Sequence, residues 1–74
     1  MAKKDKIIER IIGEDGYEEW YKGYKFHRLN GPAYIQTNGT EEWFKNGRRH
    51  REDGPAVIRP DGTECRFQNG KLPK

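Results

Sequence analysis

Hydrophobic residues in this chain come in short groups separated by pairs of residues that contain glycine. Seven of the nine glycines follow Asp or Asn. Six of these pairs recur every seven or eight residues, at Asn30-Gly31, Asn38-Gly39, Asn46-Gly47, Asp53-Gly54, Asp61-Gly62 and Asn69-Gly70. Both residues of such a pair tolerate the positive φ that a tight hairpin turn requires. The pattern therefore predicts short extended segments joined by sharp reversals.

The segments between these turns are rich in aromatic and β-branched residues, which favour strands. We expect strands at 17–22, 32–37, 40–45, 55–59 and 63–68. The second and third strands then form one hairpin, and the fourth and fifth form another. Segments 23–31 and 46–54 are polar connectors that each carry a further turn.

A longer period of 23 residues is superimposed on the turns. It relates Trp20 to Trp43, His27 to His50, and Gly31-Pro32-Ala33 to Gly54-Pro55-Ala56. Neighbouring residues on a strand point to opposite faces of a sheet. The period therefore predicts a row of Tyr21, Phe44 and Phe67 on one face and a row of Trp20, Trp43 and Arg66 on the other.

The N-terminal segment has a different pattern. Within residues 3–12, Ile7, Ile8, Ile11 and Ile12 share one face of a helix, and charged residues occupy the other. Gly13 is a typical helix end. An isolated helix of about ten residues is marginal in water. We therefore expect a short helix whose isoleucines cap the sheet or contact a second chain.

Length and composition indicate one small domain with a thin core. Of 74 residues, 31% are hydrophobic and 36% are charged. Because domains of this size bury little apolar surface, and because the exposed edges of a sheet can pair with another chain, we expect a homodimer or a larger homo-oligomer. Cys65 is the single cysteine, and no leader-like or membrane-length apolar run is present. These features predict a cytoplasmic protein without membrane contact.

The residues that could perform catalysis are few, since the chain has no serine, one cysteine and two histidines. We expect no catalytic residues, no metal and no cofactor. Cys65 is interpreted as a small buried thiol. The repetition of His27 and His50 indicates a turn or packing role, because one cysteine and two separated histidines make a poor zinc site. Glu18, Glu41 and Glu64 are interpreted as a solvated strand face.

Positive charge is densest at Arg48-Arg49-His50-Arg51, although the net charge of the chain is only +3. Arginine can form forked hydrogen bonds to carboxylate or phosphate, and tryptophan can fill a protein groove or stack on a base. We therefore predict a partner-binding set made of this segment with Trp20, Trp43 and Arg66. The expected partner is a protein with an acidic patch, and a nucleic acid or nucleotide is the alternative.

The repeated units resemble a known family. Asn-Gly-Thr-Glu-Glu-Trp-Phe-Lys-Asn-Gly at 38–47, Asp-Gly-Thr-Glu-Cys-Arg-Phe-Gln-Asn-Gly at 61–70 and the linking His-Arg-Glu-Asp-Gly-Pro-Ala at 50–56 resemble MORN repeats, in a divergent form similar to that of small bacteriophage proteins. MORN repeats are β-hairpins stacked into an elongated single sheet. The resemblance agrees with a mainly β, antiparallel single-sheet meander of about five short strands at 16–74, and the isoleucine pattern adds a short helix and a linker at 1–15.

The resemblance also implies a class of function. MORN repeats serve as scaffolds and interaction surfaces, and the repeat is not a catalytic motif. Small phage proteins of this size often antagonise host defence. We therefore expect a non-enzymatic inhibitor, phage-encoded and acting in the host cytoplasm, that occupies a host protein surface, for example in a CRISPR system. A nucleic-acid or nucleotide-binding module and a structural scaffold are the alternatives.

Overall fold

The computed structural model describes residues 8–72, and within them the secondary structure consists of short β-strands. The strands are β1 (Ile8–Ile12), β2 (Glu18–Lys22), β3 (Lys25–Phe26), β4 (Tyr34–Ile35), β5 (Glu41–Glu42), β6 (Phe44–Lys45), β7 (Arg48–Arg49), β8 (Val57–Ile58) and β9 (Glu64–Cys65). This confirms a mainly β fold with antiparallel pairing.

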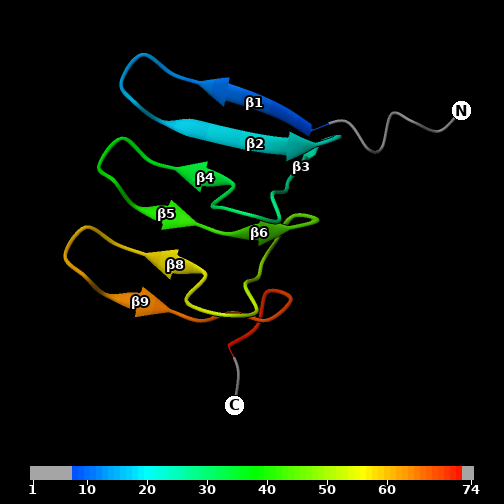
Figure 1. Cartoon of the computed structure of the whole chain (residues 1–74), viewed down its shortest axis with the longest axis vertical. Coiled ribbons are helices and arrows are strands. Elements are labelled where there is room, and N and C mark those ends of the chain that lie inside the picture. The colour runs from blue at the N-terminus through cyan, green and yellow to red at the C-terminus, as the bar shows by residue number, and fades with distance from the viewer. Residues whose placement is uncertain (1–7, 73–74) are drawn as a thin grey trace, which may run out of the picture.

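The main sheet has the order β1-β2-β4-β5-β8-β9, with β3 paired to β2. Strands that follow one another along this path are also neighbours in the sheet, so the chain is a meander, and Figure 1 shows its three hairpins stacked in one layer. The Cα atoms span only 16 Å along the shortest axis. The prediction of a single sheet is therefore correct except for β6 and β7, which pair only with each other in a separate two-stranded ribbon.

The three hairpins repeat the same register. Ile11 pairs with Glu19, Tyr34 with Glu42, and Val57 with Cys65, each pair being 23 residues beyond the one before. Strand β1 is therefore the first copy of the strand that β4 and β8 represent in the later repeats. The chain therefore contains three hairpin units, whereas Trp and His each mark only two of the repeats.

This register corrects the predicted N-terminal helix over the residues that the structure describes. Residues 8–12 form β1, which makes five cross-strand pairs with β2. A ten-residue helix has little stability of its own, whereas β-branched isoleucine fits a pleated strand paired along its length. The chain reverses at 13–17, where the Gly13 N–H donates to the Tyr17 carbonyl at 2.9 Å.

The isoleucines assigned to a cap or an oligomer contact therefore lie on a strand at the edge of the sheet. The side chains of Ile11 and Ile12 are 43% and 60% exposed. Ile8 belongs to β1, and Ile7 lies outside the described residues. The expected contact with a second chain remains a prediction.

A second set of turns lies on the opposite side of the sheet from the three hairpin turns (Figure 1). Asn46 and Gly47 have φ of 52° and 84°, and Asn69 and Gly70 have φ of 52° and 85°. Positive φ at both central residues is the requirement of a type I′ turn. The polar connectors therefore carry the further turns that the sequence predicts.

Both faces of the sheet carry apolar side chains, arranged in the predicted rows. On one face the rings of Tyr21, Tyr34 and Phe44 surround Phe26, with centroids 4.8, 5.3 and 4.9 Å from its own. Such distances are typical of favourable aromatic pairs. Fully buried apolar residues are few among the described residues, with Ala33 and Ala56 at 0% exposure and Val57 at 4%. The core is thin, as the composition predicts.

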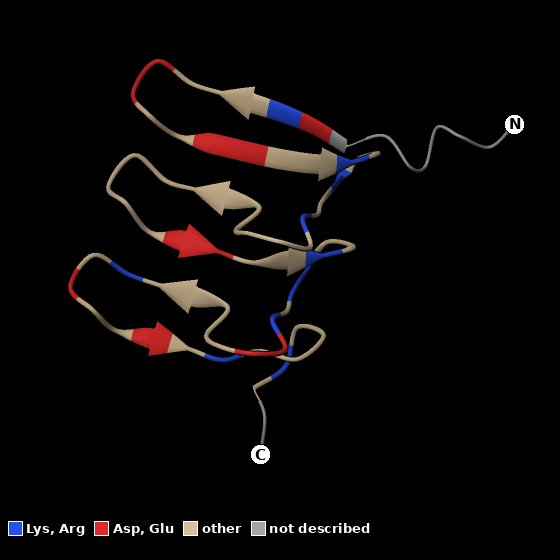
Figure 2. Cartoon of the chain, viewed as in Figure 1, with Lys and Arg blue, Asp and Glu red and all other residues tan. Residues whose placement is uncertain are grey.

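Charges that alternate in the sequence are separated in space. Figure 2 shows most acidic residues over the hairpins and their turns, and Lys and Arg along the side that carries the second set of turns. The separation arises because, in the first two repeats, two glutamates precede the aromatic pair and basic residues follow it, although Glu52 and Asp53 come after the basic segment of the second repeat. A net charge of +3 therefore conceals a strongly polarised molecule.

Candidate binding face

The predicted row of tryptophans is built from a repeated stack of an arginine on an indole. The guanidinium of Arg28 lies 3.9 Å from the ring centroid of Trp20, and that of Arg51 lies 3.8 Å from the ring centroid of Trp43. Each guanidinium also donates to a backbone carbonyl, Arg28 to Pro32 at 3.2 Å and Arg51 to Pro55 at 3.1 Å. Cation–π contact and hydrogen bonding together fix each stack.

The stacks explain the repeated Gly-Pro-Ala segments. A Cβ atom at Gly31 would lie 2.7 Å from Cζ of Arg28, and one at Gly54 would lie 3.1 Å from Cζ of Arg51. Neither glycine adopts a positive φ. Their role is to let the guanidinium lie flat between the indole and the backbone, which differs from the turn role that Asx-Gly predicts for these two pairs.

Histidine connects each repeat to the next. Nδ1 of His27 accepts a hydrogen bond from the backbone N–H of Asn46 at 2.9 Å, and Nδ1 of His50 accepts one from Asn69 at 3.0 Å. His27 is 6% exposed, and burial lowers its pKa, with a further contribution from the positive charges of Lys22 and Lys45. A neutral ring is the form that can accept this hydrogen bond. This is the turn and packing role that the repetition predicts.

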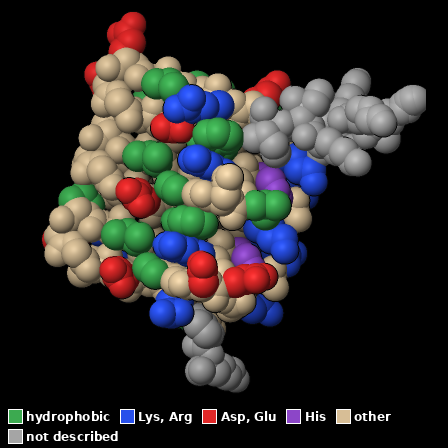
Figure 3. Space-filling model, in the orientation of Figure 1, with side chains coloured by type: hydrophobic (Ala, Val, Ile, Leu, Met, Phe, Trp, Pro, Cys, Tyr) green, Lys and Arg blue, Asp and Glu red, His purple; other side chains and the backbone are tan. Residues whose placement is uncertain are grey.

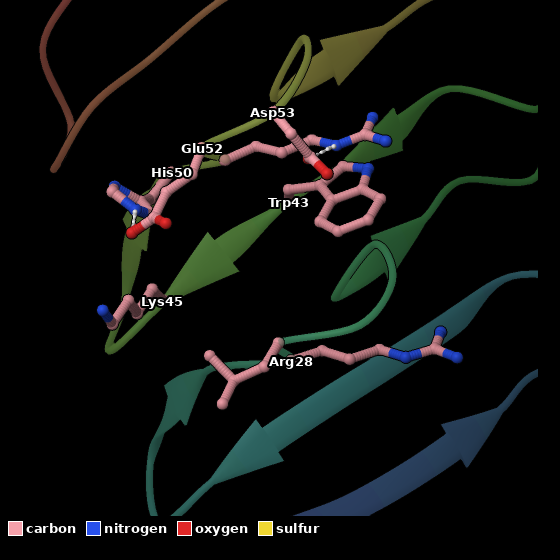
Figure 4. A pocket seen from close by; sticks show the side chains of 8 residues that line it. Arg28, Trp43, Lys45, His50, Glu52 and Asp53 are labelled. Carbon is pink, nitrogen blue, oxygen red and sulfur yellow. Dashed lines mark hydrogen bonds and ion pairs between the residues drawn. The ribbon is translucent and has the colours of Figure 1, made fainter.

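Two hollows lie beside the stacks, one in each of the first two repeats. The first is bounded by Trp20, His27 and Arg28, and the second by their counterparts Trp43, His50 and Arg51. Each has a volume of about 300 Å³. Figure 4 shows the second hollow, with Arg28 across from Trp43 and with Lys45, His50 and Glu52 along one side.

Leu29 borders both hollows and is 71% exposed. Its position in the next repeat is taken by Glu52, so the apolar side chain occurs once, between the two hollows. An exposed leucine beside ordered aromatic and arginine side chains is typical of a surface that contacts another molecule.

The two stacks differ at the indole nitrogen. Nε1 of Trp20 donates to Glu18 at 2.7 Å, and Glu18 also accepts from Arg10 at 2.9 Å. These two hydrogen bonds, that of Trp20 first, lower the pKa of Glu18. The buried Nε1 of Trp43 has no hydrogen-bond partner within residues 8–72. Each stack thus leaves one buried nitrogen without a partner among the described residues, Nε of Arg28 in the first and Nε1 of Trp43 in the second.

The basic segment 48–51 does not form one patch. Arg51 stacks on Trp43, and the ring of His50 bonds to the next repeat. Arg49 pairs with Phe44 across the ribbon and bonds to Glu42 at 2.9 Å, on the aromatic face opposite Trp43. Arg48 borders a different hollow beside the second set of turns.

The predicted partner-binding residues therefore separate into groups. Trp20, Trp43 and Arg51 lie together with His50 on one face, and Arg66 is exposed in the row that continues them. We name Trp20, Arg28, Leu29, Trp43, Arg51 and Arg66 the Trp–Arg face. Figure 3 shows a broad face of the sheet on which hydrophobic and basic side chains alternate, with acidic side chains among them.

Arg28 and Leu29 were absent from the set that the sequence predicts. The period contains the signal for Arg28, because it is the counterpart of Arg51. Leu29 breaks the period, since Glu52 replaces it. Its importance is visible only after the two hollows are placed beside each other.

The single cysteine and the three repeated glutamates lie in different environments. Among the described residues, no group of three or more His, Cys, Asp or Glu side chains is placed to hold a metal ion. Cys65 is half-buried, and Nη1 of Arg59 lies 3.8 Å from its Sγ. Glu18 and Glu41 are half-buried and Glu64 is exposed, so only Glu64 fits the solvated face expected for all three.

Comparisons with known proteins add no further constraint. No protein-family model, curated protein or solved structure gives a significant match to the chain. Over the part of the chain that the structure describes, no helix is long and apolar enough to cross a membrane.

Proposed function

We propose that this protein is a non-enzymatic binding protein that occupies the surface of a partner protein through the Trp–Arg face. The observation that carries the proposal is the pair of indole–guanidinium stacks, which the backbone holds in fixed positions at 3.9 and 3.8 Å. Tryptophan and arginine dominate the binding energy of many protein interfaces. Side chains already ordered before binding lose little entropy when the complex forms.

The charges of this face favour an acidic partner. Arg66 in the third repeat is exposed, and so is Arg10, which lies beside Trp20 at the border of this face and donates through Nε to Glu18. A guanidinium that keeps unused donors can bind a carboxylate through two parallel hydrogen bonds. Arg49, although part of the basic segment, lies on the opposite face and does not contribute to this surface.

Base stacking on the tryptophans is a weaker alternative for the same face. The guanidinium of Arg28 already covers Trp20, and that of Arg51 covers Trp43. A nucleic-acid base would have to displace a cation that is also hydrogen-bonded to the backbone.

The resemblance of the repeats to those of small phage proteins leads to a narrower proposal, in which the partner belongs to a host defence system. A direct assay expresses the protein in cells that carry an active CRISPR system and measures the transformation efficiency of a targeted plasmid. Restored transformation supports the narrower proposal. Unchanged transformation removes that system from consideration but leaves binding itself to be tested separately.

Binding is tested by capturing partners from host cytosol on the immobilised protein and identifying them by mass spectrometry. The decisive variant is Leu29→Asp, because Leu29 borders both hollows and is 71% exposed, so its replacement leaves the fold intact. Leu72→Asp is the matched control, since Leu72 is 66% exposed and borders neither hollow. Loss of affinity with Leu29→Asp alone supports the Trp–Arg face, and equal affinity of both variants refutes it.

A further inference from the structure

A second surface lies along the side of the sheet that carries the second set of turns. We name it the turn edge and define it by Lys22, Tyr24, Lys25, Lys45, Arg48 and Lys71. Three of its cations, Lys25, Lys45 and Arg48, border a hollow of about 270 Å³ together with Asn46 and Asn69. This hollow shares only Lys45 with the second hollow of the Trp–Arg face.

The turn edge contains a repeated arrangement that lowers the stability of the fold. Lys22 pairs with Lys25 across one turn, and Lys45 pairs with Arg48 across the next. Like charges placed directly opposite each other on paired strands are destabilising. Among residues 8–72, no carboxylate lies within ion-pair distance of these four cations. Folding does not explain why positive charge is concentrated here.

The stems of these cations are nevertheless held in place. The side chain of Lys25 packs on Gly47, and that of Arg48 packs on Gly70, with carbon atoms 3.5 to 3.9 Å from the position that a Cβ would take. Each side chain thus lies across the turn of the following repeat. The charged groups are presented as a row along the stacking direction, one repeat after another.

Tyr24 supplies an aromatic group in the same place. Its side chain is 101% exposed, so it contributes nothing to the core. In the next two repeats the same position of the turn is occupied by Gly47 and Gly70. In the first turn the glycine stands one residue earlier, at Gly23, which has a positive φ of 64°. A bulky aromatic at the tip of a turn that elsewhere has glycine has no role in the fold.

We propose that the turn edge binds a single strand of nucleic acid, with its phosphates on the row of cations and a base stacked on Tyr24. A basic groove combined with an exposed aromatic is the usual composition of surfaces that bind single strands. An acidic protein would use the cations but not the isolated aromatic ring, and an anionic membrane would favour a larger apolar surface.

The affinity should depend steeply on salt. If Lys25, Lys45 and Arg48 each neutralise one phosphate, the affinity for a single strand falls roughly twentyfold between 50 and 200 mM salt. Removal of one cation should lower the slope of log K against log salt by about 0.7. Removal of the Tyr24 ring should weaken binding about fivefold or more.

The experiment measures fluorescence anisotropy of a labelled oligomer of twelve deoxythymidines over a salt series. We expect Arg48→Gln to weaken binding and to reduce the salt slope, while its melting temperature stays equal or rises because a like-charge pair is removed. Arg59→Gln is the matched control, since it removes an exposed arginine beside Cys65, away from the turn edge. Tyr24→Phe should retain the affinity and Tyr24→Ala should lose it.

Three results would overturn this proposal. They are binding that does not depend on salt, equal losses for Arg48→Gln and Arg59→Gln, and affinity for poly-glutamate or for vesicles of phosphatidylcholine and phosphatidylserine that matches the affinity for the oligonucleotide. Arg48→Gln should leave partner capture through the Trp–Arg face unchanged, because Arg48 borders neither of its hollows, so failure of this proposal and failure of the Trp–Arg face are separate outcomes.

Discussion

The hydrogen bond from Asn46 to His27 is the most direct test of how the repeats are held together. His27→Ala removes the acceptor at Nδ1 and leaves the backbone N–H of Asn46 without its partner, at a site where the histidine is 6% exposed. The loss of one hydrogen bond costs about 0.5–1.5 kcal/mol, and lost packing of the buried ring adds to it. We expect a loss of about 2–3 kcal/mol in the free energy of unfolding.

That loss is large for a chain of this size. A domain of 74 residues has a total stability of roughly 4–11 kcal/mol. The expected change corresponds to a fall of about 10 to 20 °C in melting temperature. Thermal unfolding followed by tryptophan fluorescence and near-ultraviolet circular dichroism measures it, because both indoles lie in the repeats that this hydrogen bond joins.

His27→Asn is the matched variant, since its side-chain oxygen occupies nearly the position of Nδ1 and can accept the same hydrogen bond. It should recover a large part of the lost stability. Equal losses for the alanine and asparagine variants, or a loss below about 0.5 kcal/mol for alanine, would show that the hydrogen bond does not hold the repeats together.

The same histidine predicts a dependence on pH. Burial holds the pKa of His27 in the folded protein below its ordinary value of 6.5. Between the folded pKa and 6.5 the unfolded chain therefore binds more protons than the folded protein. The contribution of neutral His27 to the free energy of unfolding is complete above pH 6.5 and is lost as the pH falls from 6.5 through the folded pKa. Urea denaturation of the native protein between pH 7.5 and 5.5 should show the decline, and His27→Asn should reduce it.

Two further predictions concern the stacks and the turns. Arg51→Ala should lower stability by about 1–2 kcal/mol and change the fluorescence of Trp43, whereas Arg51→Lys should retain part of both because the cation remains; identical behaviour of the two variants in chemical denaturation would argue against the stack. Asn46→Gly should be nearly neutral, while Asn46→Val should cost about 1–2 kcal/mol at a φ of 52°; equal melting temperatures for the two would contradict the turn geometry.

The Asx-Gly pairs illustrate how far local sequence can determine structure. At Asn38-Gly39, Asn46-Gly47, Asp61-Gly62 and Asn69-Gly70 the second residue has positive φ, as the pair predicts. At Gly31 and Gly54 the glycine of the same dipeptide is required for another reason, because a side chain there would collide with a guanidinium. The sequence alone does not distinguish a turn glycine from a glycine that makes room for a side chain. The arginine that needs the space lies three residues earlier, and its position over the glycine is known only from the folded structure.

The N-terminal segment shows the limit of periodicity. Four isoleucines fit one face of a helix, yet Ile11 and Ile12 also stand 23 residues before Tyr34 and Ile35. The segment forms a strand and not a helix because β1 makes five cross-strand pairs with β2. A helix over these residues would leave that edge of β2 unpaired.

The candidate site was predicted in part. The rows that contain Trp20 and Trp43 follow from alternation along strands and from the 23-residue period, so the sequence placed these indoles on one face. The sequence did not show that Arg49 lies on the opposite face. The basic residues 48–51 are consecutive in the sequence, and only the pairing of β6 with β7 shows that their side chains lie on different surfaces.

Turn chemistry and repeat length were thus determined by the sequence itself, because both depend on residues close together in the chain. The partners of each side chain were decided only by stacking. Strand register brought Arg28 onto Trp20 and set Lys45 opposite Arg48. These contacts depend on how consecutive hairpins align, and that alignment is a property of the whole sheet.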